Sequence, residues 1–332
     1  MKTTTLVITS IANDTHPVLR QYALEAKKYN TSLIVIGDTK SPATFDIEGC
    51  DFYSIERQIG LGFELTKGLP TKHYARKNVG YLAAIKNGAN VIIETDDDNI
   101  PLDGFWLSRN GYLKARSVLT SDWVNVYRYF SKANIWPRGF NLEKIRESLP
   151  ALGPLCDVYS PIQQGLADDN PDVDAIYRLS LPLPIQFDTH DSIAVGVNAI
   201  CPFNSQNTTW FKEAFPLLYL PSYCSFRMTD IWRSFIAQRI SWTCGWPIVF
   251  HSSTVRQERN DHSLIADFED EVSGYLNNAK IVATLKSLLL QDGVHNIFEN
   301  LMCCYQALVE LGVIDEKELP LLRAWIQDLS AR

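Results

Sequence analysis

Three consecutive aspartates, Asp96, Asp97 and Asp98, come just after a segment, residues 90–94, whose centre is apolar. Adjacent carboxylates repel one another, and partly buried charges without compensation destabilise a fold by several kcal/mol. A hard divalent cation such as Mn²⁺ or Mg²⁺ removes this penalty, because it prefers carboxylate oxygens and is often shared with substrate phosphates. From an extended backbone, Asp96 and Asp98 would face one way and Asp97 the other. The triplet predicts a Mn²⁺ or Mg²⁺ site, and a solvated acidic turn is the alternative.

Two basic residues, Arg76 and Lys77, begin the segment 74–86, whose spacing predicts a helix that ends at Asn87-Gly88. This helix leads into the strand before the aspartates, so both cations can reach the same edge of the sheet, although adjacent cations often only solvate a helix face. The planar fork of Arg and the point charge of Lys suit a diphosphate. A site that binds a nucleoside-diphosphate sugar needs carboxylates that hold a metal ion and basic side chains that face the phosphates. Together these groups stabilise the diphosphate leaving group.

The elements that must position these residues alternate between strand and helix. Short apolar runs predict strands, and segments of 3.6-residue period predict helices. In chain order these are a strand at 6–9, a helix at 17–28, strands at 32–38 and 52–55, the helix at 74–86 and a strand at 90–94. Such alternation indicates an α/β fold with a Rossmann-like, mostly parallel sheet and helices on both faces. Ligands bind beyond the carboxyl ends of such strands, where Asp38 and the triplet fall.

The second half of the chain is less regular. A helix is expected within 227–246 and a strand at 246–250. The tail has strong helical periodicity, notably at 277–291 and 297–312. We therefore divide the chain into an α/β domain, residues 1–267, and a C-terminal helical region, residues 268–332.

Composition excludes several classes of protein. The chain has 332 residues, 46% hydrophobic and 21% charged, which is typical of a globular protein. A net charge of -7 argues against a nucleic-acid partner. No apolar run approaches the ~20 residues of a transmembrane segment, and the seven cysteines contain no C-x-x-C pair. We expect a cytoplasmic protein with reduced thiols and leave its oligomeric state open.

Three further residues are candidates for the site. Asp38 follows a predicted strand and could contact the base or ribose of a nucleotide, or could be a turn residue. His251 follows the strand 246–250 and could be a third metal ligand, or a polar residue leaving the sheet. Asp230 precedes a Trp-rich helix. It could deprotonate an acceptor hydroxyl or bind a sugar hydroxyl, or it could cap the helix, with Thr229 as the alternative cap.

Two segments carry a resemblance to a known family. YARKNVGYLAAIKNGANVIIETDDDN, residues 74–99, resembles a block of the STELLO family of glycosyltransferase-like proteins, in which an R-K-x-V-G-Y-L helix precedes an acidic cluster. The segment FNSQNTTWFKEAFPLLYLPSYCSFRMTDIWRSFIAQRISW, residues 203–242, is similar to the same family in its D-x-x-R/W-x-x-x-x-Q-R-x-x-W ending. Plant STELLO proteins carry a membrane anchor, which we do not expect in this chain.

More distantly, the chain is similar to the plant reversibly glycosylated polypeptides, which are UDP-arabinopyranose mutases. The shared features are the aspartate triplet, an R-G-[YF] segment that begins at Arg138, a D-[MI]-W segment that begins at Asp230, and a W/F-H-S strand end that contains His251. In the mutases, the arginine that matches Arg138 lies at the sugar site and is needed for activity. Without that match, Arg138 would be a surface residue beside a glycine turn.

The resemblance covers roughly residues 1–270 and implies a GT-A fold, a UDP-sugar donor and a divalent metal. We therefore expect a metal-dependent glycosyltransferase that uses a UDP-sugar and a glycan or other hydroxyl acceptor. The alternatives are a UDP-sugar mutase and a non-catalytic scaffold that binds a nucleotide sugar. The expected roles are catalysis for Asp230 and Arg138, donor binding for Asp38, Arg76, Lys77 and Asp97, and metal binding for Asp96, Asp98 and His251.

Overall fold

The computed structural model describes residues 3–258 and 263–331, and its centre is one mixed β-sheet. Its strands are β1 (Thr4–Thr9), β2 (Ser32–Ile36), β3 (Cys50–Tyr53), β4 (Val91–Thr95), β5 (Asn99–Pro101), β6 (Tyr112–Val118), β7 (Leu152–Tyr159), β8 (Ile162–Asp168), β9 (Ser192–Val195), β10 (Asn207–Phe211) and β11 (Ile248–Gln257). They lie in the order β3-β2-β1-β4-β10-β8-β11-β9-β6-β7, and β5 pairs with β11.

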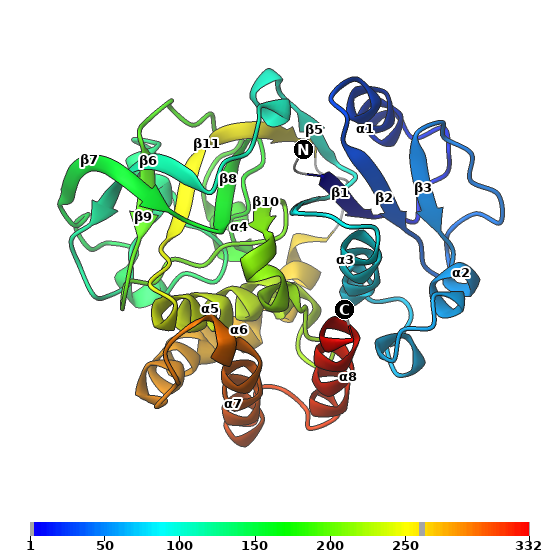
Figure 1. Ribbon diagram of the computed structural model, residues 1–332. Coiled ribbons are helices and arrows are strands. Elements are labelled where there is room, and N and C mark those ends of the chain that lie inside the picture. Colours follow the sequence, from blue (N-terminus) through cyan, green and yellow to red (C-terminus); the bar gives the residue numbers. More distant parts are fainter. Residues whose placement is uncertain (1–2, 259–262, 332) are drawn as a thin grey trace.

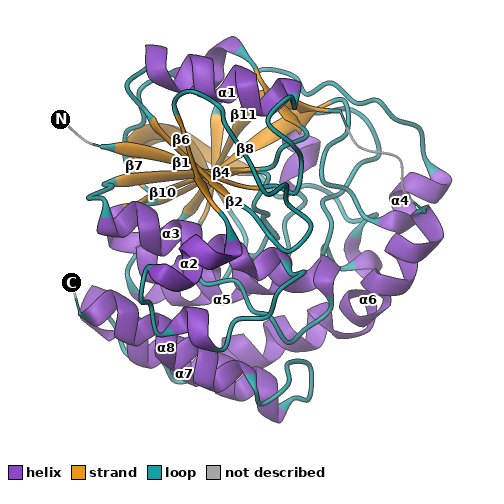
Figure 2. Ribbon diagram, turned by 90° about the vertical axis from the view of Figure 1, so that its right-hand side faces the viewer, coloured by secondary structure: helices purple, strands orange, loops and turns teal. Residues whose placement is uncertain are grey.

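Helices cover both faces of this sheet (Figure 1). They are α1 (Pro17–Lys28), α2 (Ile55–Gly60), α3 (Lys77–Lys86), α4 (Ala175–Ser180), α5 (Thr229–Thr243), α6 (Leu264–Ser287), α7 (Ile297–Glu310) and α8 (Glu318–Ser330). In Figure 2, α1 lies on one side of the sheet and α3 and α5 on the other, with α7 and α8 in a further layer below. The predicted α/β class, with helices on both faces and a helical C-terminal region, is confirmed.

The first four strands form the parallel half of the sheet. β1 pairs in parallel with β2 and β4, and β2 pairs in parallel with β3. Alternate residues of β1 enter two different cores, because successive side chains of a strand face opposite ways. Leu6 and Ile8 pack in the core that contains Tyr22 of α1, whereas Val7 packs in the core that contains Val79 of α3. This half matches the Rossmann-like arrangement predicted from the sequence.

Two glycines fix the position of α3. A Cβ atom at Gly80 would lie 2.6 Å from Cγ1 of Val7 and 2.8 Å from Cγ1 of Ile36, so only glycine lets the helix pack this closely on β1 and β2. At the end of the helix, Gly88 has a φ of +83°, a left-handed conformation that glycine adopts without strain. Helix α3 therefore packs closely on the sheet, and the chain turns at Gly88 toward β4, which begins at Val91.

The second half of the sheet contains antiparallel pairs. β10 runs antiparallel to both β4 and β8, and β11 runs antiparallel to β9 and β5. The prediction of a strand that ends at residue 250 is wrong, because β11 continues to Gln257 by pairing with β8 and β5. Sequence patterns missed this extension because Ser252–Thr254 is a polar run, which is typical of a loop.

The C-terminal helices share a core with the sheet. Ile281 of α6, Leu301 of α7 and Trp325 of α8 belong to the same buried cluster as Val7 of β1. The division that we placed between residues 267 and 268 lies inside α6. Within residues 3–258 and 263–331, none of the helices is both long enough and apolar enough to cross a membrane.

Candidate functional site

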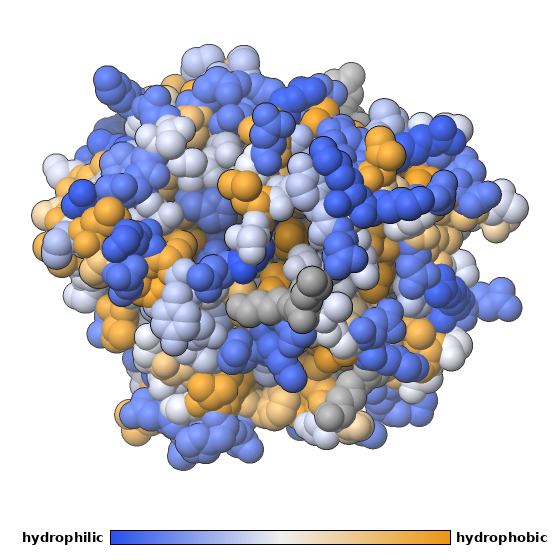
Figure 3. Space-filling model, turned by 45° about the horizontal axis from the view of Figure 1, so that its top comes forward, coloured by the Kyte–Doolittle hydropathy of each residue, from blue (hydrophilic) through white to orange (hydrophobic). Residues whose placement is uncertain are grey.

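A pocket of about 590 Å³, here called the large pocket, lies at the carboxyl ends of β1, β2 and β4. Ser10, directly after β1, and Asp38, two residues after β2, both line it. Asp96, Asp97 and Asp98, which follow β4, line it as well. The face of the molecule drawn in Figure 3 carries many hydrophilic residues, with apolar residues scattered among them. The structure thus brings Asp38 and the triplet together at the predicted edge of the sheet.

The aspartate triplet does not continue β4 as an extended strand. The backbone turns at Asp97 and Asp98, where the N–H of Asn99 donates to the carbonyl of Asp96 at 3.3 Å, and then returns as β5. The expectation that Asp97 points away from its neighbours is therefore wrong, because it assumed extended geometry. The turn directs all three carboxylates to the same pocket.

Asp96 is held by Tyr74, which lies just before α3, and by Lys77, the first residue of α3. Its Oδ1 accepts hydrogen bonds from the Tyr74 hydroxyl at 2.7 Å and from Lys77 Nζ at 3.0 Å. Lys77 is fully buried, and its Nζ also donates to the Thr95 carbonyl at 2.7 Å. Burial raises the pKa of Asp96, and the Lys77 ammonium opposes that rise. Lys77 does not line the large pocket, so its position suits holding Asp96 in place rather than contacting a diphosphate.

Asp98 carries a carboxylate oxygen with unused bonding capacity. Oδ2 accepts from Gln257 Nε2 at 3.0 Å, whereas Oδ1 is buried without a hydrogen-bond partner in the described part of the chain. Burial, and then the negative charge of Asp96, raise the pKa of Asp98 to about 7. On the other side of the turn, Asp97 accepts a hydrogen bond from the Ser10 hydroxyl. A nearby cation stabilises the charged form of carboxylates that are crowded together in this way.

Arg76 lines the large pocket and is itself buried. Its Nε donates to Gln58 Oε1 at 2.7 Å and its Nη1 to the Leu69 carbonyl at 3.2 Å. Its Nη2 has no hydrogen-bond partner among the described residues. Burial lowers the pKa of the guanidinium. Arg76 therefore keeps a donor that an anionic ligand could satisfy, in line with its expected role.

Asp38 shapes one wall of the large pocket. Its Oδ1 accepts from the backbone N–H of Lys72 at 2.8 Å, and its Oδ2 accepts from the backbone N–H of His73 at 3.1 Å. These bonds tie the end of β2 to the chain that leads into Tyr74. Asp38 thus has a structural role, and it also lines the pocket in which we expected it to contact a nucleoside.

A smaller cavity of about 90 Å³, here called the small pocket, adjoins the large pocket. Asp96, Arg227 and Gln257 line both pockets. The small pocket is also lined by Arg138, Asp172, Arg178, Asn204, Gln206 and Asp230. The structure therefore places both predicted catalytic residues, Arg138 and Asp230, beside the aspartate triplet.

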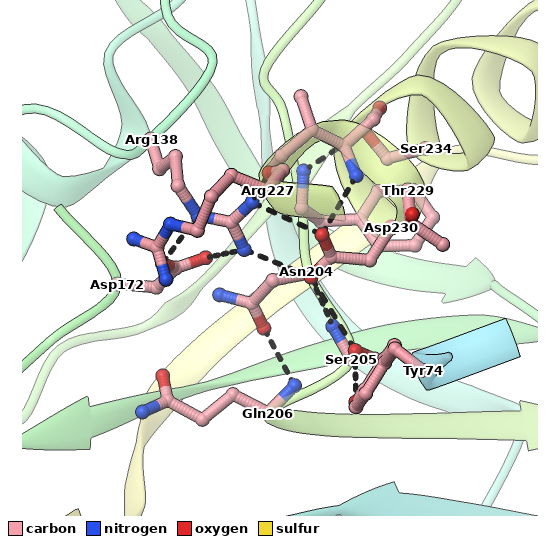
Figure 4. A network of polar contacts seen from close by, with 12 residues as sticks. Tyr74, Arg138, Asp172, Asn204, Ser205, Gln206, Arg227, Thr229, Asp230 and Ser234 are labelled. Carbon is pink, nitrogen blue, oxygen red and sulfur yellow. Dashed lines mark hydrogen bonds and ion pairs between the residues drawn. The ribbon is translucent and has the colours of Figure 1, made fainter. Parts of the chain in front are cut away.

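Arg138 bridges two carboxylates at the small pocket (Figure 4). Nε and Nη2 donate to Asp172 at 2.8 and 2.9 Å, and Nη1 and Nη2 donate to Asp230 at 3.1 and 2.9 Å. Nη1 also donates to the Arg227 carbonyl. A guanidinium has five N–H groups, and these contacts use all of them. Arg138 is thus placed to hold Asp172 and Asp230, and has no donor left for a sugar.

Asp230 is a weak base in this setting. Burial alone would raise the pKa of its carboxyl group, but the charge and hydrogen bonds of Arg138 outweigh burial and lower the pKa. Ser205 also donates to Asp230 Oδ2, from its N–H and its hydroxyl, each at 3.3 Å. The expected helix cap is absent at both candidates, because α5 begins at Thr229 with Met228 in the capping position. The lowered pKa favours a positioning role over deprotonation of an acceptor.

His251 lies apart from the aspartates, so its expected role as a third metal ligand is not supported. It sits within β11, six residues before Gln257, and lines neither pocket. Six extended residues span roughly 20 Å. Burial, and then the charge of Arg109, lower the pKa of His251 to about 4. The sequence suggested a ligand because residue 251 was taken as the end of the strand.

Sequence reasoning missed several residues of the site. Tyr74 links Asp96 to Ser205, because its hydroxyl bonds Asp96 Oδ1 at 2.7 Å and Ser205 Oγ at 2.6 Å, and Ser205 in turn donates to Asp230. Both Tyr74 and Ser205 lie within the segments that resemble the STELLO family, which was the available signal. Asp172 and Gln257 carried no local signal, since tertiary contacts alone bring them to the site.

The donor set at the triplet fits a hard divalent cation. The buried, unpartnered Oδ1 of Asp98 is the atom that a cation would satisfy, with Asp96 beside it. Among the described residues, no group of three His, Cys, Asp or Glu side chains is arranged to hold a metal ion. The protein would therefore supply two carboxylates, and a ligand and water the remaining oxygens, which is the usual arrangement of Mg²⁺ at phosphate sites.

The fold and the two pockets define an α/β protein with a polar ligand site at the carboxyl edge of a parallel half-sheet. Residues 227–332 match the family model described as STELLO glycosyltransferases. The chain is 29% identical over 319 residues to Probable glycosyltransferase STELLO2 of Arabidopsis thaliana, covering 90% of this chain and 41% of that protein. It is also 29% identical over 321 residues to Probable glycosyltransferase STELLO1 of the same plant, again covering 90% and 41%. The resemblance to the STELLO family is confirmed.

This chain thus spans about two fifths of the length of the curated relatives that it matches. Among solved structures, M. tuberculosis glucosyl-3-phosphoglycerate synthase aligns with a TM-score of 0.39 at 12% sequence identity, over 84% of this chain and 81% of that chain.

Proposed function

We propose that the protein is a metal-dependent glycosyltransferase that uses a UDP-sugar as donor. The observation that carries this proposal is the carboxylate oxygen Oδ1 of Asp98, which is buried without a partner among the described residues and belongs to a residue that lines the large pocket. Similarity to proteins named as probable glycosyltransferases supports the same class. The acceptor is a glycan or another hydroxyl compound.

In this proposal the large pocket holds the nucleoside diphosphate. Asp38 and its neighbours form the wall toward the nucleoside, and the spare Nη2 donor of Arg76 faces an anionic group of the ligand. Asp96 and Asp98 hold Mn²⁺ or Mg²⁺, which when bound would neutralise negative charge on the leaving diphosphate. Lys77 and Tyr74 keep Asp96 oriented for that role.

The donor sugar would enter the small pocket, which opens beside Asp96. There Arg138 fixes the two carboxylates Asp172 and Asp230, so that their geometry is set before the sugar arrives. Preorganised polar groups of this kind stabilise a transition state without reorganisation at the moment of reaction. The lowered pKa of Asp230 supports a role in sugar positioning rather than in proton abstraction.

Titration calorimetry with UDP, in the presence and absence of Mn²⁺, tests the proposal. We expect UDP to bind with Mn²⁺ and to bind at least tenfold more weakly without it. Asp98→Asn should lose this dependence on Mn²⁺, whereas the control Asp103→Asn, which changes an exposed aspartate, should keep it. Equal UDP affinity with and without Mn²⁺ in the wild type would contradict the metal site, and absence of UDP binding would contradict the donor class.

A turnover assay then separates transfer from the other activities. Release of UDP from UDP-sugars, in the presence of a panel of hydroxyl acceptors, is the expected result. Conversion of UDP-arabinopyranose to its furanose form would assign a mutase instead. Binding without turnover across all donors would assign a scaffold.

A further inference from the structure

The small pocket differs chemically from the large one. Ile11, Ile36 and Phe226 line the large pocket together with its polar groups. Every residue that lines the small pocket is an aspartate, an arginine, an asparagine or a glutamine. A site of this kind recognises hydroxyl groups by hydrogen bonds, and it offers no apolar wall to a methyl group.

The size of the small pocket suits one sugar unit. Its volume is about 90 Å³, and a water needs roughly 10–15 Å³ by this measure, so the cavity holds roughly seven waters. An added N-acetyl group would have to place its methyl carbon against charged side chains.

The guanidinium groups of the small pocket are already engaged by the protein. All five N–H groups of Arg138 donate to protein acceptors, and Arg227 Nη2 donates to the buried Glu271 at 2.8 Å. Arg178 Nη2 donates to the Pro171 carbonyl at 2.8 Å. These arginines already donate to protein acceptors, so they offer little to a sugar carboxylate. The negative charge of Asp172 would also repel that carboxylate, which disfavours a uronosyl group.

The two carboxylates held by Arg138 differ in the acceptor capacity that they have left. A carboxylate has about four acceptor positions. Asp230 accepts from Arg138 twice, from the Ile231 N–H at 3.0 Å and twice from Ser205, so its positions are filled. Asp172 accepts two side-chain hydrogen bonds from Arg138, at 2.8 and 2.9 Å, and its side chain is 12% exposed. Asp172 is thus the better placed of the two to accept from sugar hydroxyls.

We propose that the small pocket takes a neutral, unsubstituted hexosyl or pentosyl group, and that Asp172 selects it by accepting hydrogen bonds from its hydroxyls. This inference rests on the proposed function, because it assigns the sugar class of the same donor. A site that bonds substrate hydroxyls discriminates strongly, since its buried polar groups are left unpaired by the wrong ligand.

Calorimetry with Mn²⁺ and five nucleotides tests the inference. The probes are UDP, UDP-glucose, UDP-arabinopyranose, UDP-N-acetylglucosamine and UDP-glucuronate. We expect at least one neutral sugar to bind about tenfold more tightly than UDP-N-acetylglucosamine and UDP-glucuronate. If either of those two binds as tightly as the better neutral sugar, the inference is overturned, while UDP binding leaves the proposed function standing.

Asp172→Asn gives the matching test of the residue. The variant should bind UDP as the wild type does, which reports an intact large pocket, and should lose about tenfold in the preference for the neutral UDP-sugar over UDP. Asp157→Asn, an exposed aspartate on β7, is the control and should keep the preference. An Asp172→Asn protein that keeps the full preference contradicts the role of Asp172. A wild type that binds none of the five nucleotides contradicts the proposed function, and the inference falls with it.

Discussion

Glu94 and Arg233 form a fully buried, two-point ion pair, with Nη1 to Oε2 at 2.9 Å and Nη2 to Oε1 at 2.8 Å. Glu94 lies on β4 two residues before Asp96, and Arg233 lies on α5 nearly one turn after Asp230. The pair therefore joins the strand that leads into Asp96 to the helix that carries Asp230. Trp210 Nε1 donates to Glu94 at 2.8 Å and helps to satisfy the buried charge.

The first prediction concerns this pair. Glu94→Gln should lower the free energy of unfolding by about 3–5 kcal/mol, because it leaves the buried Arg233 guanidinium without its counter-charge. The double variant Glu94→Leu, Arg233→Met removes both charges, and it should recover much of the stability. Urea unfolding of the wild type, Glu94→Gln, the matching single variants Glu94→Leu and Arg233→Met, and the double variant measures the coupling. Additive losses in the double variant would mean that the two residues act independently.

The second prediction concerns Lys77. Lys77→Met removes the cation that donates to Asp96 at 3.0 Å, so the pKa of Asp96 should rise further and the protein should lose about 2–4 kcal/mol at pH 8. The double variant Lys77→Met, Asp96→Asn should be more stable than Lys77→Met alone at that pH. Urea unfolding at pH 8, without divalent metal, gives the comparison. If the second substitution adds a further loss, Lys77 does not serve to compensate Asp96.

Most N-terminal elements were predictable from the sequence, whereas the site contacts were not. The strand expected at 52–55 lies at Cys50–Tyr53, and the helix α2 that begins at Ile55 was missed. The helix at 17–28 was predicted with the bounds that α1 has, because Pro17 sets its start and the period of its apolar residues sets its extent. The burial of Lys77 could not be predicted, since lysine is usually exposed and its partners Thr95 and Ser205 lie far along the chain. Local sequence patterns predict whether a segment is a helix or a strand, but they do not predict which polar groups from distant segments contact one another.

The same limit explains the roles assigned to Arg138 and Asp230. Both were named as site residues, and both do lie at one pocket. Their ion pair spans 92 positions of the sequence, and Asp172 lies 34 positions after Arg138. The pairing uses the N–H groups of the Arg138 guanidinium and lowers the pKa of Asp230. Tertiary geometry was needed to propose positioning rather than proton transfer as the role of these two residues.

The third prediction concerns Tyr74, whose hydroxyl bridges Asp96 and Ser205. Tyr74→Phe keeps the ring and removes the bridge, so Asp96 loses one of the two groups that orient it. Partners that orient metal ligands typically contribute 10–100-fold in metal affinity. We expect Mn²⁺-dependent UDP binding to weaken by that factor, as measured by calorimetry. Tyr112→Phe, at a tyrosine that is 66% exposed, is the control and should bind as the wild type does. Unchanged binding in Tyr74→Phe would show that the bridge does not orient Asp96.

The fourth prediction concerns the pH dependence of stability at His251. Burial, and then the charge of Arg109, lower its pKa from 6.5 to about 4 in the folded protein. Between these values the unfolded chain binds the proton and the folded protein does not, so stability falls as the pH drops through this window. The shift corresponds to at most about 3 kcal/mol. His251→Gln removes this titration, and its free energy of unfolding should decline less than that of the wild type between pH 7 and pH 4.5. His190→Gln, at an exposed histidine, should follow the wild type. Urea unfolding across this range makes the comparison, and equal declines in His251→Gln and the wild type would mean that His251 is not buried in its neutral form.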